Sequence, residues 1–123
     1  LKKKNIKLLI RLNGENIYDK NLFINNDIIV HDLFFEDLSV PSIDIIKKFM
    51  NLIDNTDNNE LVAIHCRAGL GRTGLLICIW LIIKLNFTPS NAIAYIRLMR
   101  PGSIMGYQGF FLESLEYFKK FIY

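Results

Sequence analysis

A short aliphatic run, a glycine-rich loop and a long apolar segment follow one another in this chain, and they constrain its fold most. Leu61–Ile64 is apolar throughout and has the length of a buried strand. The loop contains Gly69 and Gly71, and Leu75–Ile83 is apolar on all sides, as in a helix that is buried on most faces. A buried strand that leads directly into such a helix favours an α/β fold with a parallel sheet.

Two further aliphatic runs, Ile6–Leu12 and Ile28–Val30, are predicted strands. The spacing predicts a brief helix over Asn16–Ile24 and a second helix that begins at Pro41, a residue favoured at the first helical position. Two successive strand–helix–strand units pair their strands in parallel through right-handed crossovers. The expected fold is therefore α/β, with a parallel-rich central sheet flanked by helices. Three strands make a thin sheet, so we expect it to lack an N-terminal strand.

The C-terminal third is predicted to be helical. Thr88 and Pro89 supply an N-cap and a first-turn proline for a helix that ends at Met99. The residues expected to face inward on this helix are Ala92, Ile93, Ile96 and Met99. A last helix is expected from about Gln108, with an inward face made of Phe111, Leu112, Leu115, Phe118 and Ile122.

Composition narrows the classes of protein to which the chain can belong. Its 123 residues, 51% of them hydrophobic and 22% charged, suit one domain with a packed core. The longest apolar run is far shorter than the ~20 residues of a membrane span, and the net charge of +3 does not suit a dedicated nucleic-acid binder. Two cysteines without a signal peptide predict an intracellular protein of the cytoplasm or nucleus. Because the chain opens on Leu1, we expect a piece of a longer protein.

The loop between the third strand and the long helix carries the chemistry. Cys66 leaves the end of the strand, and Arg72 and Thr73 follow at the start of the helix. Backbone N–H groups and the helix dipole favour an anion there, and a guanidinium matches two phosphate oxygens. The expected phosphate cradle consists of Arg67, Ala68, Gly69, Leu70, Gly71 and Arg72. The same positive field favours the thiolate of Cys66, a nucleophile able to attack phosphorus.

Other residues are predicted to assist this nucleophile. The Thr73 hydroxyl is placed to donate to the Cys66 sulfur, and His65 is expected to brace the loop through its ring nitrogens. Gln108 is a candidate for orienting the water of a second step, against the alternative that it makes only local bonds at a helix start. Arg100 is a candidate brace for the phosphate loop, or simply a charge at a helix C-terminus.

In-line attack needs an acid for the departing oxygen, and that acid must come from another segment. Asp37 is the preferred candidate, since its loop follows a parallel strand and reaches the same edge of the sheet as Cys66. Glu36 and Asp32 are the competitors, with Asp32 expected to hold the loop instead. Cys78 lies within an apolar helix and is predicted to be a core thiol.

The segment 65–74 resembles the signature of cysteine-dependent dual-specificity protein phosphatases, since it reads HCRAGLGRTG. Three further segments resemble the mitotic-exit, cell-division-cycle subgroup: IRLN at 10–13, HDLFFEDLSVP at 31–41 and RPGSIMGYQ at 100–108. The resemblance implies a protein tyrosine phosphatase-like fold, with Cys66 as nucleophile, Arg72 as phosphate-binding arginine and Asp37 as general acid. It also implies an N-terminal substrate-binding domain that residues 1–123 do not include.

The function expected from these observations is hydrolysis of phosphotyrosine and phosphoserine or phosphothreonine in proteins, through a cysteinyl-phosphate intermediate. Such a reaction uses no metal and no cofactor, and the partners are phosphoprotein substrates rather than nucleic acid or membrane. Three alternatives stay open. They are a phosphoinositide phosphatase, for which the loop has few added charges, a non-catalytic phosphoprotein-binding module, and a triphosphatase for RNA ends, which the weak net charge disfavours.

Overall fold

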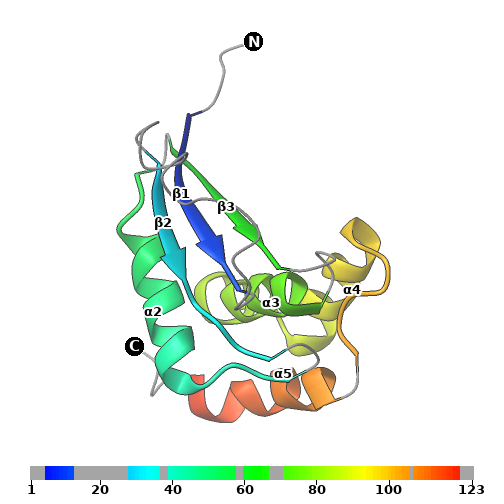
Figure 1. The fold of residues 1–123 in the computed structure, drawn as a ribbon. Helices are drawn as coiled ribbons and strands as arrows, with labels where there is room; N and C mark the ends of the chain where they lie inside the picture. Colours follow the sequence, from blue (N-terminus) through cyan, green and yellow to red (C-terminus); the bar gives the residue numbers. More distant parts are fainter. Residues whose placement is uncertain are drawn as a thin grey trace.

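The computed structural model describes residues 5–12, 28–36, 39–57, 60–66, 71–105 and 107–119. In these residues two strands are followed by a helix, a third strand and then three helices (Figure 1). The strands are β1 (Asn5–Arg11), β2 (Ile29–Asp32) and β3 (Glu60–His65). The described helices are α2 (Ile43–Asp54), α3 (Gly71–Leu85), α4 (Pro89–Met99) and α5 (Tyr107–Phe118). The helix expected over Asn16–Ile24 lies outside the described residues.

The three strands form one parallel sheet, as the sequence predicts, and their order in it is β2-β1-β3. The register brings the carboxyl ends of the strands together, with Arg11 opposite Asp32 on one side and opposite His65 on the other. The segments that follow β2 and β3 therefore leave the sheet at the same edge. Among the described strands β3 pairs only with β1, and a further strand in this sheet stays a prediction.

Helix α2 begins two residues later than the sequence predicts. Ser42 is its N-cap, and its hydroxyl oxygen accepts a hydrogen bond from the Ile45 amide at 3.3 Å. Pro41 precedes that cap, so the prediction that it is the first helical residue is wrong. The reason is that serine satisfies a free amide of the first turn with its side chain, which proline cannot do. The buried face of α2 holds Ile46, Phe49 and Met50.

Helix α4 follows the predicted pattern except at one position. The Thr88 hydroxyl caps α4 by accepting from the Asn91 amide at 3.1 Å, with Pro89 in the first turn. Ala92 and Ile96 are buried as expected, but Met99 is 65% exposed. Because α4 ends at Met99, this residue extends beyond the core, and the helical period alone does not show where packing stops. In α5 the predicted inward residues Leu112 and Leu115 are buried, whereas the side chain of Phe118 and the whole of Ile122 lie outside the described residues.

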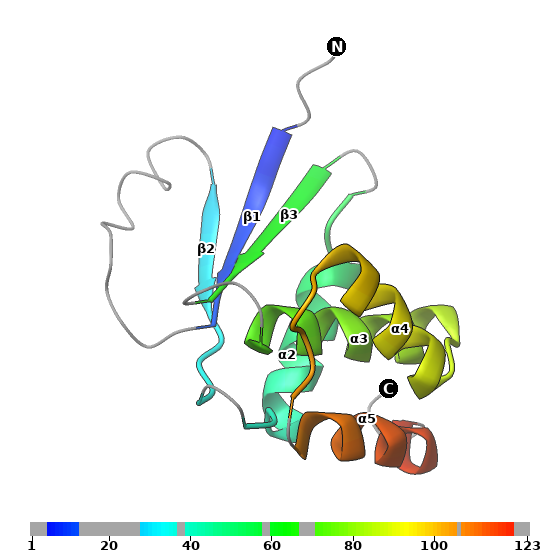
Figure 2. The same cartoon turned by 90° about the vertical axis from the view of Figure 1, so that its right-hand side faces the viewer.

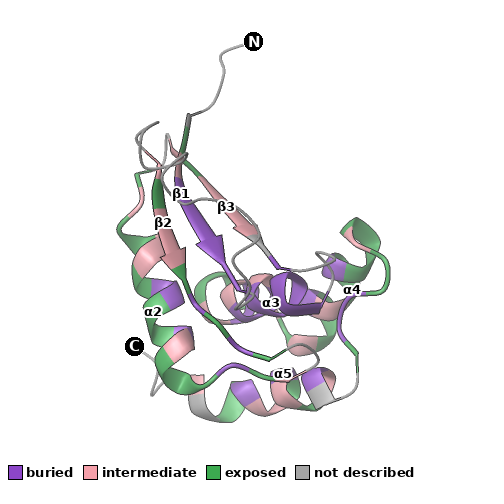
Figure 3. Ribbon diagram, viewed as in Figure 1, coloured by how far each residue is buried: buried purple, intermediate pink, exposed green. Residues whose placement is uncertain are grey.

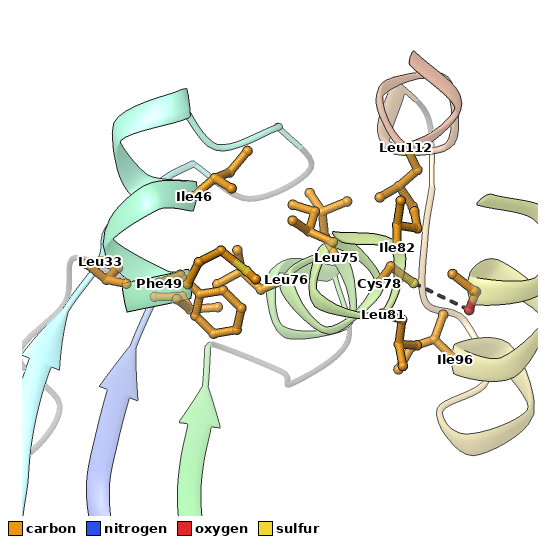
Figure 4. Close-up of a cluster of buried hydrophobic side chains, with 14 of the residues drawn as sticks. Leu33, Ile46, Phe49, Leu75, Leu76, Cys78, Leu81, Ile82, Ile96 and Leu112 are labelled. Carbon is orange, nitrogen blue, oxygen red and sulfur yellow. Dashed lines mark hydrogen bonds between the residues drawn. The ribbon is translucent and has the colours of Figure 1, made fainter. Parts of the chain in front are cut away.

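Helix α3 occupies the centre of the molecule, with residues of α2, α4, α5 and β1 in one core cluster around it (Figures 2 and 3). Leu75, Leu76, Ile79 and Ile82 are fully buried. Figure 4 shows Phe49 of α2 on one side of this helix, and Ile96 of α4 and Leu112 of α5 on the other. Within the described residues no helix is both long and apolar enough to cross a membrane.

Candidate active site

Cys66 follows the last residue of β3, and the first turn of α3 brings Thr73 against it. The Thr73 hydroxyl donates a hydrogen bond to the Cys66 sulfur over 3.1 Å, the contact that the sequence predicts. Cys66 is only 8% exposed and Thr73 is buried, so the thiol is not on an open surface. The predicted cradle residues Arg67, Ala68, Gly69 and Leu70 lie outside the described residues, as does the side chain of His65.

Arg72 lies in the same first turn of α3 and is buried. Its Nη1 donates to the backbone carbonyl of Phe35, 37 residues earlier in the chain, at 3.3 Å. This bond joins the first turn of α3, at the candidate phosphate site, to the loop that follows β2. A buried guanidinium at a helix N-terminus adds its charge to the partial positive charge of the free amides there.

Asp32 and Arg11 form an ion pair where β2 and β1 end. The Arg11 Nε and Nη2 atoms donate to the two carboxylate oxygens of Asp32 at 2.6 and 3.0 Å. Asp32 therefore holds the start of the loop, as the sequence analysis expects of it, which leaves Asp37 and Glu36 as candidate acids. Arg11 is buried, and it was not among the site residues predicted from the sequence. The signal was an arginine inside an aliphatic strand, at the edge of the sheet where β2 ends on an aspartate.

The loop after β2 is fixed to the end of β1 by its backbone. The Leu33 amide donates to the Arg11 carbonyl at 2.8 Å, and the Phe35 amide to the Leu12 carbonyl at 3.4 Å. Farther along, the Ser39 amide and hydroxyl both donate to the Glu36 carbonyl. Asp37 lies outside the described residues. The nearest described residues on either side of it, Glu36 and Ser39, are hydrogen-bonded to one another.

Gln108, at the start of α5, is fully buried. Its Nε2 donates to the carbonyl of Ser39 at 3.3 Å, and its Oε1 accepts from the Met105 amide at 3.1 Å. The amide group thus makes one local bond and one bond to a residue 69 positions away. A role in orienting water stays a prediction.

Arg100 and Arg97 contribute differently to the segment between α4 and α5. Arg100 uses its backbone, since its amide donates to Ile96 and its carbonyl accepts from Ser103. A bracing role for its side chain stays a prediction. Arg97, which the sequence analysis did not select, donates from Nε to the Ser103 carbonyl at 3.2 Å and from Nη2 to the Ile104 carbonyl at 2.8 Å.

Cys78 is fully buried in α3, where its sulfur donates to the Ala92 carbonyl at 3.5 Å (Figure 4). Burial raises the pKa of this thiol to about 12, and the charge of Arg97 lowers it only in part. Because the thiolate is the reactive form, we expect iodoacetate at neutral pH to modify Cys66 and to leave Cys78 unmodified. Peptide mapping after brief alkylation checks this, with a sample in denaturant as the control in which both react. Comparable labelling of both in the folded protein would contradict it.

Comparison with known proteins places these features in a family. Residues 1–86 match a family model described as "Polymorphic toxin system, DSP-PTPase phosphatase". The chain is 42% identical over 119 residues to the tyrosine-protein phosphatase CDC14 homolog of Schizosaccharomyces pombe, covering 96% of this chain and 22% of that protein. It is 45% identical over 115 residues to the human dual specificity protein phosphatase CDC14A, covering 94% of this chain and 19% of the relative.

Solved structures share the same fold. A putative protein tyrosine phosphatase from Leishmania major superposes with a TM-score of 0.74 at 28% identity, over 89% of this chain and 72% of that one. The phosphatase Tk-PTP in its active form superposes with a TM-score of 0.81 at 20% identity, over 94% and 80% of the two chains. The protein tyrosine phosphatase-like fold predicted from the sequence is thereby confirmed, and this chain belongs to the DSP-PTPase family of dual-specificity phosphatases.

Proposed function

We propose that this chain is the catalytic part of a dual-specificity protein phosphatase that hydrolyses phosphotyrosine and phosphoserine or phosphothreonine. The observation that carries the proposal is the buried Cys66 sulfur, which accepts a hydrogen bond from Thr73 in the helical turn that also holds the buried Arg72. This arrangement supplies a nucleophile, a hydrogen-bond donor to it and a phosphate-binding cation in one place. Relatives named as tyrosine or dual specificity phosphatases support it.

The first proposed step transfers the phosphoryl group to sulfur. The Cys66 thiolate attacks phosphorus, so that an S–P bond forms while the P–O bond to the leaving group breaks. Asp37 gives its proton to the departing oxygen, which would otherwise leave as a costly alkoxide or phenoxide. Arg72 and the amides of residues 67–72 bind the equatorial phosphate oxygens, on which charge accumulates in the transition state.

The second proposed step returns the enzyme to its starting state. Water attacks the phosphocysteine, the Asp37 carboxylate takes the proton of that water, and the S–P bond breaks to release inorganic phosphate. The hydroxyl of Thr73, 3.1 Å from the sulfur, stabilises the thiolate as it leaves. His65 and Arg100 are proposed to brace the phosphate-binding loop without contacting the reacting atoms.

Asp37→Asn tests the acid. Asparagine has the shape of aspartate but no proton to give, so the loss should depend on the leaving group. We expect kcat on a phosphoserine peptide to fall by on the order of 10²-fold or more, the size of a general-acid contribution. An activated aryl phosphate, whose leaving group needs little protonation, should lose far less. Steady-state kinetics on both substrates measures the difference.

Glu36→Gln is the matched comparison for that experiment, since Glu36 is the exposed carboxylate next to Asp37. If the leaving-group dependence appears in Glu36→Gln instead, the acid is Glu36. If Asp37→Asn slows both substrates equally, the assignment of Asp37 as the acid is wrong. A phosphoinositide in the same assay tests the alternative substrate class, because preferred hydrolysis of that lipid would contradict the protein-phosphatase proposal.

The organisation of the whole protein belongs to the same proposal. The chain spans 22% and 19% of the two curated relatives described above, which supports a single catalytic domain within a longer protein. A separate N-terminal domain that helps bind phosphoproteins fits that difference in length. Cys66 and Cys78 are both free thiols, which fits a reducing, intracellular compartment. A role in the cell cycle is proposed on the names of the CDC14 relatives alone.

A further inference from the structure

The segment between α4 and α5 packs directly on the first turn of α3. Ser103 and Ile104 are almost fully buried. A Cβ atom added to Gly74 would lie 2.9 Å from the Ser103 hydroxyl oxygen and 3.0 Å from the Ser103 Cβ. Gly74 follows Thr73 and Arg72, so Ser103 lies against the turn from which both candidate site residues extend.

This segment has a backbone conformation that needs support. Gly102 has a φ of 90° and Ile104 has a φ of 63°. Positive φ suits glycine, but for a β-branched residue such as isoleucine it is strained. Such a residue persists where its surroundings hold it, and the carbonyls of Ser103 and Ile104 are both held by the guanidinium of Arg97 at 3.2 and 2.8 Å. Arg97 therefore fixes the segment at its strained point.

Gln108 carries this constraint to the loop of the proposed acid. The residue after Ile104 is Met105, whose amide donates to Gln108 Oε1, and Gln108 Nε2 in turn donates to the Ser39 carbonyl. Ser39 follows Asp37 by two residues, and Phe35, two residues before Asp37, is bonded to Arg72. The proposed acid loop is thus held on one side by Arg72 and on the other by a chain of contacts that begins at Arg97.

We propose that Arg97 is a positioning residue for proton transfer: by fixing the Ser103–Met105 segment it sets Gln108, and Gln108 holds the loop that carries Asp37. This inference rests on the proposed function. It gives the buried side-chain amide of Gln108 a role, which is to hold the acid loop through the Ser39 carbonyl. The alternative is that Arg97 only stabilises the fold, in which case its loss would affect every substrate alike.

Arg97→Met tests this inference, because methionine keeps an unbranched side chain in α4 but removes both hydrogen bonds. A misplaced acid costs most where the leaving group needs its proton. We therefore expect kcat on the phosphoserine peptide to fall about ten-fold, with KM nearly unchanged, while kcat on the activated aryl phosphate falls less than about three-fold. Arg97→Lys, which keeps one charged donor, should recover part of the lost rate.

Two controls accompany the kinetics. Lys47→Met removes an exposed cation from α2, so it measures the effect of charge removal alone and should leave the ratio of the two kcat values unchanged. Amide hydrogen exchange at Met105 reports on the hydrogen-bond network that links Arg97 to Gln108, and it does so independently of the kinetics. The Met105 amide should exchange about ten-fold faster in Arg97→Met, because the hydrogen bond to Gln108 Oε1 weakens.

The outcomes separate the inference from the function on which it rests. Equal loss on both substrates, or no loss on either, would overturn the positioning role while Asp37→Asn still discriminates between the substrates. Faster exchange at Met105 without any change in the kcat ratio would also overturn it, because the network would then be purely structural. A wild-type chain that hydrolyses neither substrate would refute the proposed function, and the positioning role with it.

Discussion

Cys66→Ser is expected to reduce phosphatase turnover to less than about 1% of the wild-type rate, because a serine hydroxyl is almost entirely protonated at neutral pH and is a weak nucleophile without a base. In the structure Cys66 accepts a hydrogen bond from Thr73, and no described side chain accepts one from it. Among the described side chains, serine at this position would find no base to activate it. Measurement of kcat in the presence of a metal chelator, on phosphotyrosine and phosphoserine peptides, gives the result.

Cys78→Ser is the matched control for this loss. Both cysteines are buried free thiols, but only Cys66 lies at the end of β3 against the first turn of α3. Cys78→Ser should lower thermal stability, because a buried hydroxyl is less favourable than a thiol, and should keep kcat per folded molecule. Retained turnover in Cys66→Ser, with a normal thermal transition, would eliminate the cysteinyl-phosphate mechanism.

Arg72→Lys is expected to lower kcat by on the order of 10²-fold or more, a loss similar to removal of one donor from an oxyanion site. Lysine keeps the charge but loses the planar fork that binds two phosphate oxygens together. The ammonium also replaces a guanidinium that is buried and donates to the Phe35 carbonyl. The expected loss is therefore greater than that of an exposed arginine.

The relative loss of kcat on two substrates distinguishes Arg72→Lys from Asp37→Asn, the variant that removes the proposed acid. Arg72 is proposed to act on the phosphoryl group itself, which a phosphoserine peptide and an activated aryl phosphate share. Both substrates should thus lose most of their rate in Arg72→Lys, with a further loss on the phosphoserine peptide from the weakened bond to the Phe35 carbonyl, whereas Asp37→Asn should spare the aryl phosphate. A near-normal rate in Arg72→Lys would mean that only the charge at this position matters. A loss confined to the phosphoserine peptide would mean that Arg72 serves the acid loop instead.

The sequence predicts the elements that local patterns define. The aliphatic runs predict β1, β2 and β3 and their parallel pairing, and Thr88–Pro89 predicts the start of α4. The strand–loop–helix order around Cys66 also predicts the contact with Thr73. Each of these depends on residues that are close in sequence, or on the rule that parallel strands end at one edge of the sheet.

Contacts between segments that are distant in the sequence could not be predicted from it. Arg11 and Asp32 form their ion pair only because β1 and β2 end side by side. The bond from Gln108 to Ser39 spans 69 positions, and no periodicity signals it. Arg97 looks like an ordinary last-turn cation of α4, so the strained backbone at Ile104 that it supports becomes evident only in three dimensions.

The central position of α3 links the site to the cooperativity of folding. The helix whose first turn holds Arg72 and Thr73 is also the one around which α2, α4 and α5 pack. A segment buried on most sides opens only when the surrounding structure opens with it, so its opening free energy approaches that of global unfolding. Phosphate affinity and the native fold should consequently disappear in a single transition, without a partly unfolded species that still binds its ligand.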